Sequence, residues 1–144
     1  RGYALKVSQV HGGRHPELIP IQQLVEEVNR ELSAHLVKEE NILFPFIKEL
    51  VMAKDRSQSP RTAQFGSVQN PIHMMEEEHE TAGRYMEEIR TLSNNYALPD
   101  DACASYSLLF KMLNDFEEDL HIHVHLENNI LFPKAIALEK HLNP

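Results

Sequence analysis

A histidine and a glutamate four residues apart occur twice in this sequence, each time ahead of the same short tail. The first copy reads His35-Leu-Val-Lys-Glu39-Glu-Asn-Ile-Leu-Phe-Pro45, and the second reads His123-Val-His-Leu-Glu127-Asn-Asn-Ile-Leu-Phe-Pro133. Seven of the eleven positions are identical. Residues four apart lie on one face of a helix, so each copy presents an imidazole beside a carboxylate. Each copy therefore supplies half of a candidate metal site.

Both pairs fall on or beside the apolar stripe of the helix that carries them. A buried carboxylate is costly unless it is paired, protonated or bound to a metal, so this position favours a role as ligand. The stripe of the first helix comprises Ile21, Val25, Val28, Leu32, Leu36, Leu43, Phe46 and Leu50, and that of the second comprises Tyr106, Phe110, Leu113, Phe116 and Leu120. The alternative is that the pairs form only hydrogen bonds in the core.

Start and stop signals divide the chain into helices joined by loops. We expect a helix that ends at His11 before a glycine stop, a second from Pro20 that is kinked near Pro45, a third from Asn70-Pro71 and a fourth after Pro99-Asp100. Residues from about 54 to 70 are polar and aperiodic, which predicts a long connection. No segment alternates as a strand does, so the sequence predicts an all-α, antiparallel up-down four-helix bundle.

In that topology the second and fourth helices are parallel, and their two pairs face each other across the core. His79 lies in register with the apolar stripe of the third helix and enters the same region. Two carboxylates and three imidazoles are a suitable ligand set for two metal ions, with the glutamates as bridges. The predicted metal ligands are therefore His35, Glu39, His79, His123 and Glu127.

Other polar residues are assigned less specific places. Glu31 and Asp119 precede the paired histidines by four, so they either hold the imidazoles or carry protons, or simply border the polar face. Most of the Glu76–Glu78 run is expected on the solvated side, and Cys103 is expected to be a small core residue. His11 falls at the wrong end of the bundle to be a ligand. Surface positions are predicted for His15, His73, His121, His125 and His141.

Composition places the chain among globular proteins. Its 144 residues suit one domain over 1–144, and the formal charge of -8 argues against a nucleic-acid or anionic-membrane partner. A single cysteine excludes an intrachain disulfide and suits a cytoplasmic location. No apolar run is long enough to span a membrane. The opening Arg1-Gly2-Tyr3 has no initiator methionine, so we expect a truncated first helix and a natural start further upstream.

Longer segments around these residues resemble the haemerythrin-like di-iron domain of the repair-of-iron-centres proteins (the RIC, YtfE, ScdA and DnrN group). The segments are Glu31-Leu-Ser-Ala-His35-Leu-Val-Lys-Glu39-Glu, Pro71-Ile-His-Met-Met-Glu-Glu-Glu-His79-Glu and the second copy from His123 to Pro133, with weaker matches at Lys6-Val-Ser-Gln-Val-His11-Gly and Pro99-Asp-Asp-Ala-Cys103. The resemblance covers nearly the whole chain.

The resemblance implies two oxo-bridged iron ions, joined by Glu39 and Glu127 and capped by the three histidines. It also implies repair of iron-sulfur clusters damaged by nitric oxide or oxidants, iron-sulfur proteins as partners, a cytoplasmic location and a homodimer. The family's helix-one histidine and its cysteine-bearing N-terminal domain would both precede Arg1. Gly83 stands where oxygen-carrying haemerythrins have a second histidine in helix three, which favours labile iron or the binding of a small gas.

Two alternatives remain open at this point. The first is a sensor or carrier that binds oxygen or nitric oxide reversibly and repairs nothing. The second is a purely structural bundle that binds zinc or no metal. The spacing of the ligands does not distinguish iron from manganese, since both accept oxygen-rich sites with some imidazole.

Overall fold

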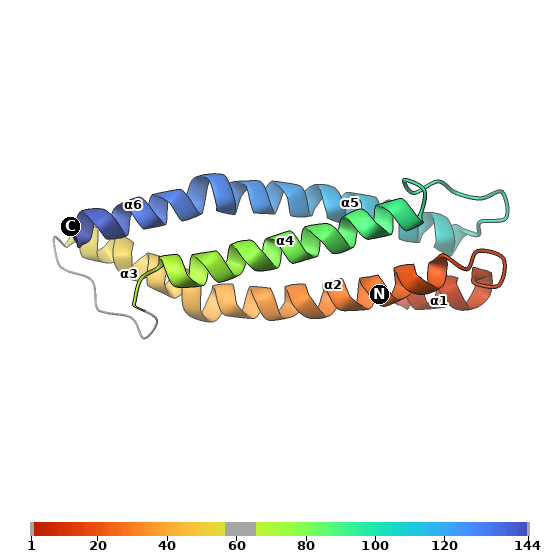
Figure 1. Ribbon diagram of the computed structural model, residues 1–144, viewed down its shortest axis with the longest axis horizontal. Helices are drawn as coiled ribbons and strands as arrows, with labels where there is room; N and C mark the ends of the chain where they lie inside the picture. Colours follow the sequence, from red (N-terminus) through yellow and green to blue (C-terminus); the bar gives the residue numbers. More distant parts are fainter. Residues whose placement is uncertain (1, 57–65, 144) are drawn as a thin grey trace. The chain divides into compact units, whose positions relative to one another are not determined.

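The computed structural model describes residues 2–56 and 66–143, and the regular elements of this part of the chain are helices. Two short π-helical segments, η1 and η2, continue long α-helices without a break (Figure 1). The order is α1 (Gly2–His11), α2 (Leu18–Lys38), η1 (Glu39–Leu43), α3 (Phe44–Asp55), α4 (Gln69–Leu92), α5 (Ala104–Leu126), η2 (Glu127–Leu131) and α6 (Phe132–Leu142). The predicted all-α bundle is confirmed, and within these ranges no helix is both long and apolar enough to cross a membrane.

The helix bounds agree closely with the start and stop signals. The first helix ends at His11 as predicted, whereas α2 and α4 each begin two residues before the proline that announced them. The long connection predicted for residues 54–70 is only partly visible, because residues 57–65 lie outside the described part of the chain. Short helix-terminal differences of this size are ordinary, since the first turn has no fixed intrahelical partners.

Contacts divide the described residues into two compact units. Unit 1 contains residues 2–32 and 81–121, and unit 2 contains residues 33–56, 66–80 and 122–143. All five predicted metal ligands belong to unit 2. The single domain predicted for residues 1–144 stays a prediction.

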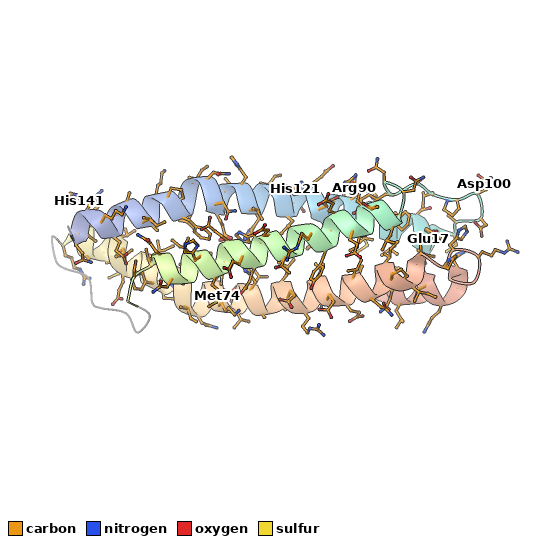
Figure 2. All side chains as sticks on the ribbon, in the orientation of Figure 1. Glu17, Met74, Arg90, Asp100, His121 and His141 are labelled. Carbon is orange, nitrogen blue, oxygen red and sulfur yellow. The ribbon has the colours of Figure 1, made fainter. Side chains whose placement is uncertain are left out.

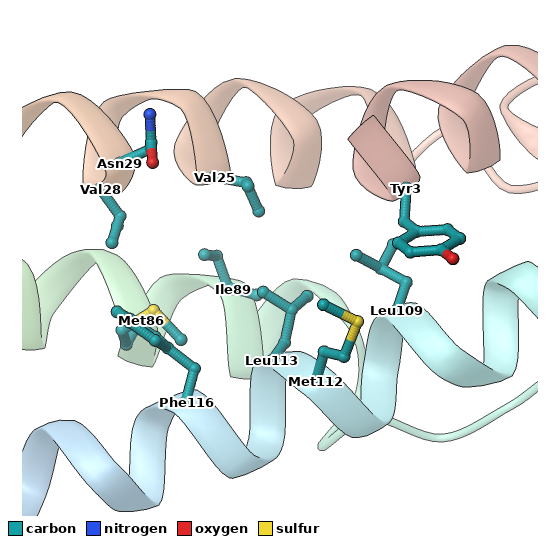
Figure 3. Close-up of a pocket in the computed structure, with 10 residues that line it drawn as sticks. All are labelled: Tyr3, Val25, Val28, Asn29, Met86, Ile89, Leu109, Met112, Leu113 and Phe116. Atoms are coloured by element: carbon teal, nitrogen blue, oxygen red, sulfur yellow. The ribbon is translucent and has the colours of Figure 1, made fainter. Parts of the chain in front are cut away.

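Unit 1 packs apolar side chains from α1, α2, α4 and α5. Tyr106 is fully buried, and its ring lies edge-on against Phe110 with 4.9 Å between centroids. A cavity of about 180 Å³ opens in this unit (Figure 3). Phe116, which was predicted to be buried, lines that cavity and is 39% exposed. The other lining residues are Tyr3, Val25, Val28, Asn29, Met86, Ile89, Leu109, Met112 and Leu113.

A buried carboxylate in unit 1 was not predicted. Glu117 is 4% exposed and accepts hydrogen bonds from the guanidinium of Arg90, including one from Nε at 2.8 Å. Arg90 also donates to Asn95 and lies 4.9 Å from the ring centroid of Tyr96. Burial, and then the nearby Glu117, raise the pKa of Tyr96 to about 12. Three consecutive residues after α4, Asn94 to Tyr96, adopt positive φ values of 53°, 61° and 60°, which is an unusual turn for residues other than glycine. Arg90 contacts this turn at Asn95 and Tyr96.

Unit 2 has a core formed by α3, α4 and α6 and the segments that precede α3 and α6. Within it, α4 runs antiparallel to α3 and α6 (Figure 1). Leu36 was predicted to face this core but is 47% exposed. The core residues are Leu43, Phe46, Leu50, Val68, Ile72, Met75, Phe132 and Ala135.

The two π-helical segments carry the sequence repeat. In η1 the carbonyl of Glu39 accepts the N–H of Phe44, five residues on, and in η2 the carbonyl of Glu127 accepts the N–H of Phe132. A proline directly follows each of the two donors, Phe44 and Phe132. In an ordinary α-helix the proline ring would clash with the carbonyl four residues earlier. The wider turn relieves that clash. The predicted irregularity near Pro45 is therefore a π-turn, and it occurs twice.

The unit 2 core yields a prediction about stability. Leu50 is 0% exposed, so Leu50→Ala removes apolar contacts and leaves a cavity, and we expect it to lower the free energy of unfolding by about 2–5 kcal/mol. The neighbouring Val51 is 47% exposed, and Val51→Ala should change it by less than about 0.5 kcal/mol. Urea unfolding followed by circular dichroism measures both. Equal effects of the two substitutions would contradict the assignment of Leu50 to the unit 2 core.

Candidate metal centre

The structure brings all five predicted ligands together in unit 2. His35, Glu39, His79, His123 and Glu127 each offer one ligand atom, and these atoms lie within 4.8 Å of one another. The glutamates come from the first residue of each π-helical segment, and the paired histidines lie one turn earlier. His79 comes from the middle of α4. That these side chains bind a metal stays a prediction.

On one side of the cluster, His35 and Glu39 are almost completely buried. The Nε2 atom of His35 lies 2.8 Å from Oε1 of Glu39, and both side chains are 1% exposed. The Nδ1 atom of His35 donates to Oε1 of Glu78 at 3.1 Å, and Nζ of Lys38 donates to the other oxygen of Glu78 at 2.6 Å. Glu78 thereby fixes the ring of His35 and directs Nε2 inward.

On the other side, two histidines converge on one carboxylate oxygen. Oε1 of Glu127 lies 2.9 Å from Nε2 of His79 and 2.7 Å from Nε2 of His123, while His123 is also 3.7 Å from Oε1 of Glu39. Nδ1 of His79 donates to Oδ1 of Asn128 at 3.0 Å, and the ring stacks on Phe132. A histidine held through Nδ1 keeps the lone pair of Nε2 free for a ligand.

Three atoms of this side are buried and lack hydrogen-bond geometry. They are Nε2 of His79 and both carboxylate oxygens of Glu127. The short contacts of Glu127 therefore bring atoms close without aligning a donor with an acceptor. Unsatisfied buried polar atoms are rare and costly, and a cation between them would satisfy all three. The donor set fits a metal.

Charges in the cluster support one another. Burial alone would lower the pKa of His35, but hydrogen bonds to Glu39 and Glu78 outweigh it, and the pKa is raised. Burial alone would raise the pKa of Glu127, but the imidazoles of His79 and His123 beside it outweigh this effect, and the pKa is lowered. The cluster therefore holds a carboxylate in its ionised form, as cation binding requires.

Exposure differs sharply within the cluster. The side chains of His35 and His79 are 1% exposed and that of Glu127 is 6% exposed, whereas that of His123 is 39% exposed. The cluster is thus closed on the side of His35 and His79. His123 is the most exposed of its five members.

Glu78 gives a prediction about metal affinity. Glu78→Gln keeps the size of the side chain but removes the charge that holds both His35 and Lys38, so we expect the affinity for iron to fall ~10–100-fold. Glu80→Gln is the matched control, because Glu80 is exposed on the same helix. Titration of the metal-free chain with Fe²⁺ measures both. An unchanged affinity in Glu78→Gln would show that this carboxylate does not orient a ligand.

Sequence reasoning assigned the supporting residues less well. The Nδ1 atom of His35 is hydrogen-bonded to Glu78. Glu31 was one candidate for this supporting role, whereas Glu78 was expected on the solvated side. Glu78 is only 20% exposed. Asn128 was not considered, although it directly follows a predicted ligand. Asp119 is exposed, and its role stays a prediction.

The remaining histidines are not members of the cluster. His73, His121, His125 and His141 are exposed as predicted, and two of them are marked in Figure 2. His15 is a correction, because it is half-buried and its Nε2 lies 2.8 Å from Oδ1 of Asp101. Cys103 is a second correction, since it is exposed and not a core residue.

Comparison with known proteins agrees with this geometry. Residues 4–135 match the Hemerythrin HHE cation binding domain. A "Probable iron-sulfur cluster repair protein" of Haemophilus influenzae is 41% identical over 133 residues, which are 92% of this chain and 54% of that protein. The "Iron-sulfur cluster repair protein YtfE" of Escherichia coli O81 is 35% identical over 136 residues, 94% of this chain and 56% of that protein. The chain thus spans about half the length of these relatives.

Proposed function

Because this chain belongs to the hemerythrin HHE cation-binding family, we propose that its cluster of five ligands binds two iron ions. Glu39 and Glu127 would bridge the ions, because a carboxylate has two oxygens and can bind one ion through each. Both carboxylates lie near one imidazole, that of His123. His35, His79 and His123 would cap the pair. Iron in such a site supplies Lewis acidity, redox change and affinity for small oxygen- or nitrogen-containing ligands, and an oxo bridge belongs to the same proposal.

The proposed role of this pair is to restore iron-sulfur clusters damaged by nitric oxide or oxidative stress. Iron would leave the site as the material delivered to a damaged cluster, or nitric oxide would react there. The names of the relatives support this role, and iron-sulfur proteins in the cytoplasm would be its partners. A homodimer is part of the same proposal.

One observation carries the metal proposal. Nε2 of His79 and both oxygens of Glu127 are buried without hydrogen-bond partners, in the middle of a cluster of five ligand atoms. In a core stabilised by hydrogen bonds alone, these three atoms would be paired. Five protein donors are also fewer than two octahedral ions require, which would leave positions for exchangeable ligands.

The test combines metal analysis with a repair assay. The chain is purified from iron-rich medium, and its iron, manganese and zinc contents are measured together with the absorption spectrum. An iron-sulfur enzyme inactivated by nitric oxide is then treated with the iron-loaded chain, with the metal-free chain, or with an equal amount of free Fe²⁺. We expect two irons per chain and recovery of the enzyme beyond that given by free Fe²⁺. Zinc alone, or no metal, would overturn the di-iron proposal.

A second candidate function is reversible binding of oxygen or nitric oxide, as in a sensor or carrier. The exposure of His123 favours it, because a ligand residue at the surface brings the cluster close to dissolved gas. Spectral changes that reverse when the gas is removed, with no iron lost to a chelator and no recovery of the damaged enzyme, would support this candidate over repair.

A further inference from the structure

The two buried histidines of the cluster are held by side chains of different charge. Nδ1 of His35 donates to the carboxylate of Glu78 at 3.1 Å, whereas Nδ1 of His79 donates to the amide oxygen of Asn128 at 3.0 Å. Both imidazoles are 1% exposed, so burial does not distinguish them. A hydrogen bond to a carboxylate is stronger than one to a neutral amide, and it makes the other ring nitrogen a better electron donor to a metal. Nε2 of His35 is therefore a stronger ligand than Nε2 of His79.

The support of His35 is fixed in its turn. Nζ of Lys38 donates to the second oxygen of Glu78 at 2.6 Å, and that carboxylate is only 20% exposed. Lys38 offsets part of the negative charge, but it also holds Glu78 where it faces the ring. The ring of His79 is held by packing against the stacked ring of Phe132, with 6.0 Å between centroids, and this contact adds no charge. The electrostatic difference between the two supports therefore remains.

The other ligands differ in the same direction. Glu39, which lies beside His35, is 1% exposed. His123, which lies beside Glu127, is 39% exposed. Neighbours hold a buried ligand on every side, whereas an exposed imidazole changes rotamer quickly and can be replaced by water. The orphaned atoms of His79 and Glu127 give their side affinity for a cation, but the rate of release depends on how easily one ligand leaves.

We propose that the two metal positions are inequivalent and that Asn128 is the positioning residue that makes one of them labile. The position beside His79 and His123 releases its ion first. The position beside His35 and Glu39 retains its ion longer. This inference rests on the proposed di-iron site, and it identifies which of the two ions would be delivered. Release only exchanges protein ligands for water or for the ligands of an acceptor, so it needs no oxidant or reductant.

The test follows the release of Fe²⁺ to an excess of a coloured chelator, without oxygen and at pH 7. The chain is first loaded to saturation, and absorbance then gives the rate and the amplitude of each phase. Asn128→Asp gives His79 a carboxylate support like that of His35. Asn129→Asp is the matched control, because Asn129 is the adjacent amide, is exposed and contacts His125 instead of a cluster member. Circular dichroism checks that each variant keeps its helices.

We expect the wild-type chain to release its iron in two phases of equal amplitude. Their rates should differ by about tenfold or more, since residues that support a ligand alter metal affinity ~10–100-fold. Asn128→Asp should slow the fast phase about tenfold, while Asn129→Asp leaves both phases unchanged. Glu78→Gln should instead accelerate the slow phase. A substitution that merely loosens the bundle would accelerate release, so a slower fast phase is specific to the support of His79.

Several outcomes would overturn this inference, and they differ from failure of the proposed function. Saturation with two irons that leave in a single phase would overturn the inference alone. An unchanged fast phase in Asn128→Asp, or equal slowing in Asn129→Asp, would do the same. If Asn128→Asp loses its helices, Glu78→Gln decides, and an unchanged slow phase would overturn the inference. Saturation below two irons would contradict the di-iron proposal itself and this inference with it.

Discussion

Replacing Glu39 and Glu127 together with leucine is expected to abolish iron binding while the helical fold is kept. The two carboxylates are the only anionic members of the cluster, and both are buried among its histidines. Without them the remaining imidazoles are too few to hold two cations. Because apolar side chains replace buried charges, the metal-free variant should be as stable as the metal-free wild type or more stable, by about 1–4 kcal/mol.

Two measurements check this result. Iron per chain after loading should fall from two to background, and circular dichroism should show unchanged helix content. Glu40→Leu is the matched control, because Glu40 is the neighbouring carboxylate, lies in the same π-helical segment and is exposed. Retention of two irons by the double variant would refute the assignment of these ligands. Loss of iron in Glu40→Leu would point instead to a general disturbance of η1.

Arg90→Ala is expected to destabilise unit 1 by about 2–4 kcal/mol. The substitution leaves Glu117 buried without its cation, and a buried carboxylate that loses its partner keeps the full cost of desolvation. The value lies toward the lower part of the range for buried pairs, because the side chain of Arg90 is itself 37% exposed. The turn at Asn94 to Tyr96 also loses its contact with the guanidinium.

Chemical unfolding measures the loss, and a second substitution tests its cause. In Arg90→Ala with Glu117→Leu, the unpaired charge is gone, so part of the stability should return. Arg84→Ala serves as the control on the same helix, since the Arg84 guanidinium makes an exposed hydrogen bond to Thr81. If the double variant is no more stable than Arg90→Ala, the unpaired charge of Glu117 is not the cause of the lost stability.

Much of the fold follows from periodicity and from a few strong signals. Apolar spacing gave the helices, and glycine and proline gave most of their ends to within a few residues. The wrong predictions concern residues whose exposure depends on whether another helix packs against them. Phe116 was placed inward from its spacing, yet it lines an open cavity. Periodicity alone does not show whether a helix face has a partner to cover it.

The clustering of the five predicted ligands was predictable, because two matching His-Glu pairs on helices with apolar stripes must meet in the core; their binding of a metal stays a prediction. The supports of these ligands were not predictable, because partners such as Glu78 and Asn128 are defined by contacts between helices. The buried Glu117 was missed for the same reason, since only its distance from Arg90 distinguishes it from the exposed acids around it. One signal for the π-turns was present. His35, Glu39 and Leu43 follow one another in two successive four-residue steps, where a regular stripe alternates three and four.

The π-turns bear on which insertions and deletions the chain tolerates. Each adds one residue to its helix, so everything after it is turned by about 100° relative to an uninterrupted α-helix. Removing one residue between Glu39 and Pro45 would keep the carboxylate in place but rotate the apolar face of α3 away from the core that Leu50 occupies. Related sequences that preserve this packing should therefore keep the length of the segment fixed, and an insertion or deletion within it should be less tolerated than a substitution of its exposed residues.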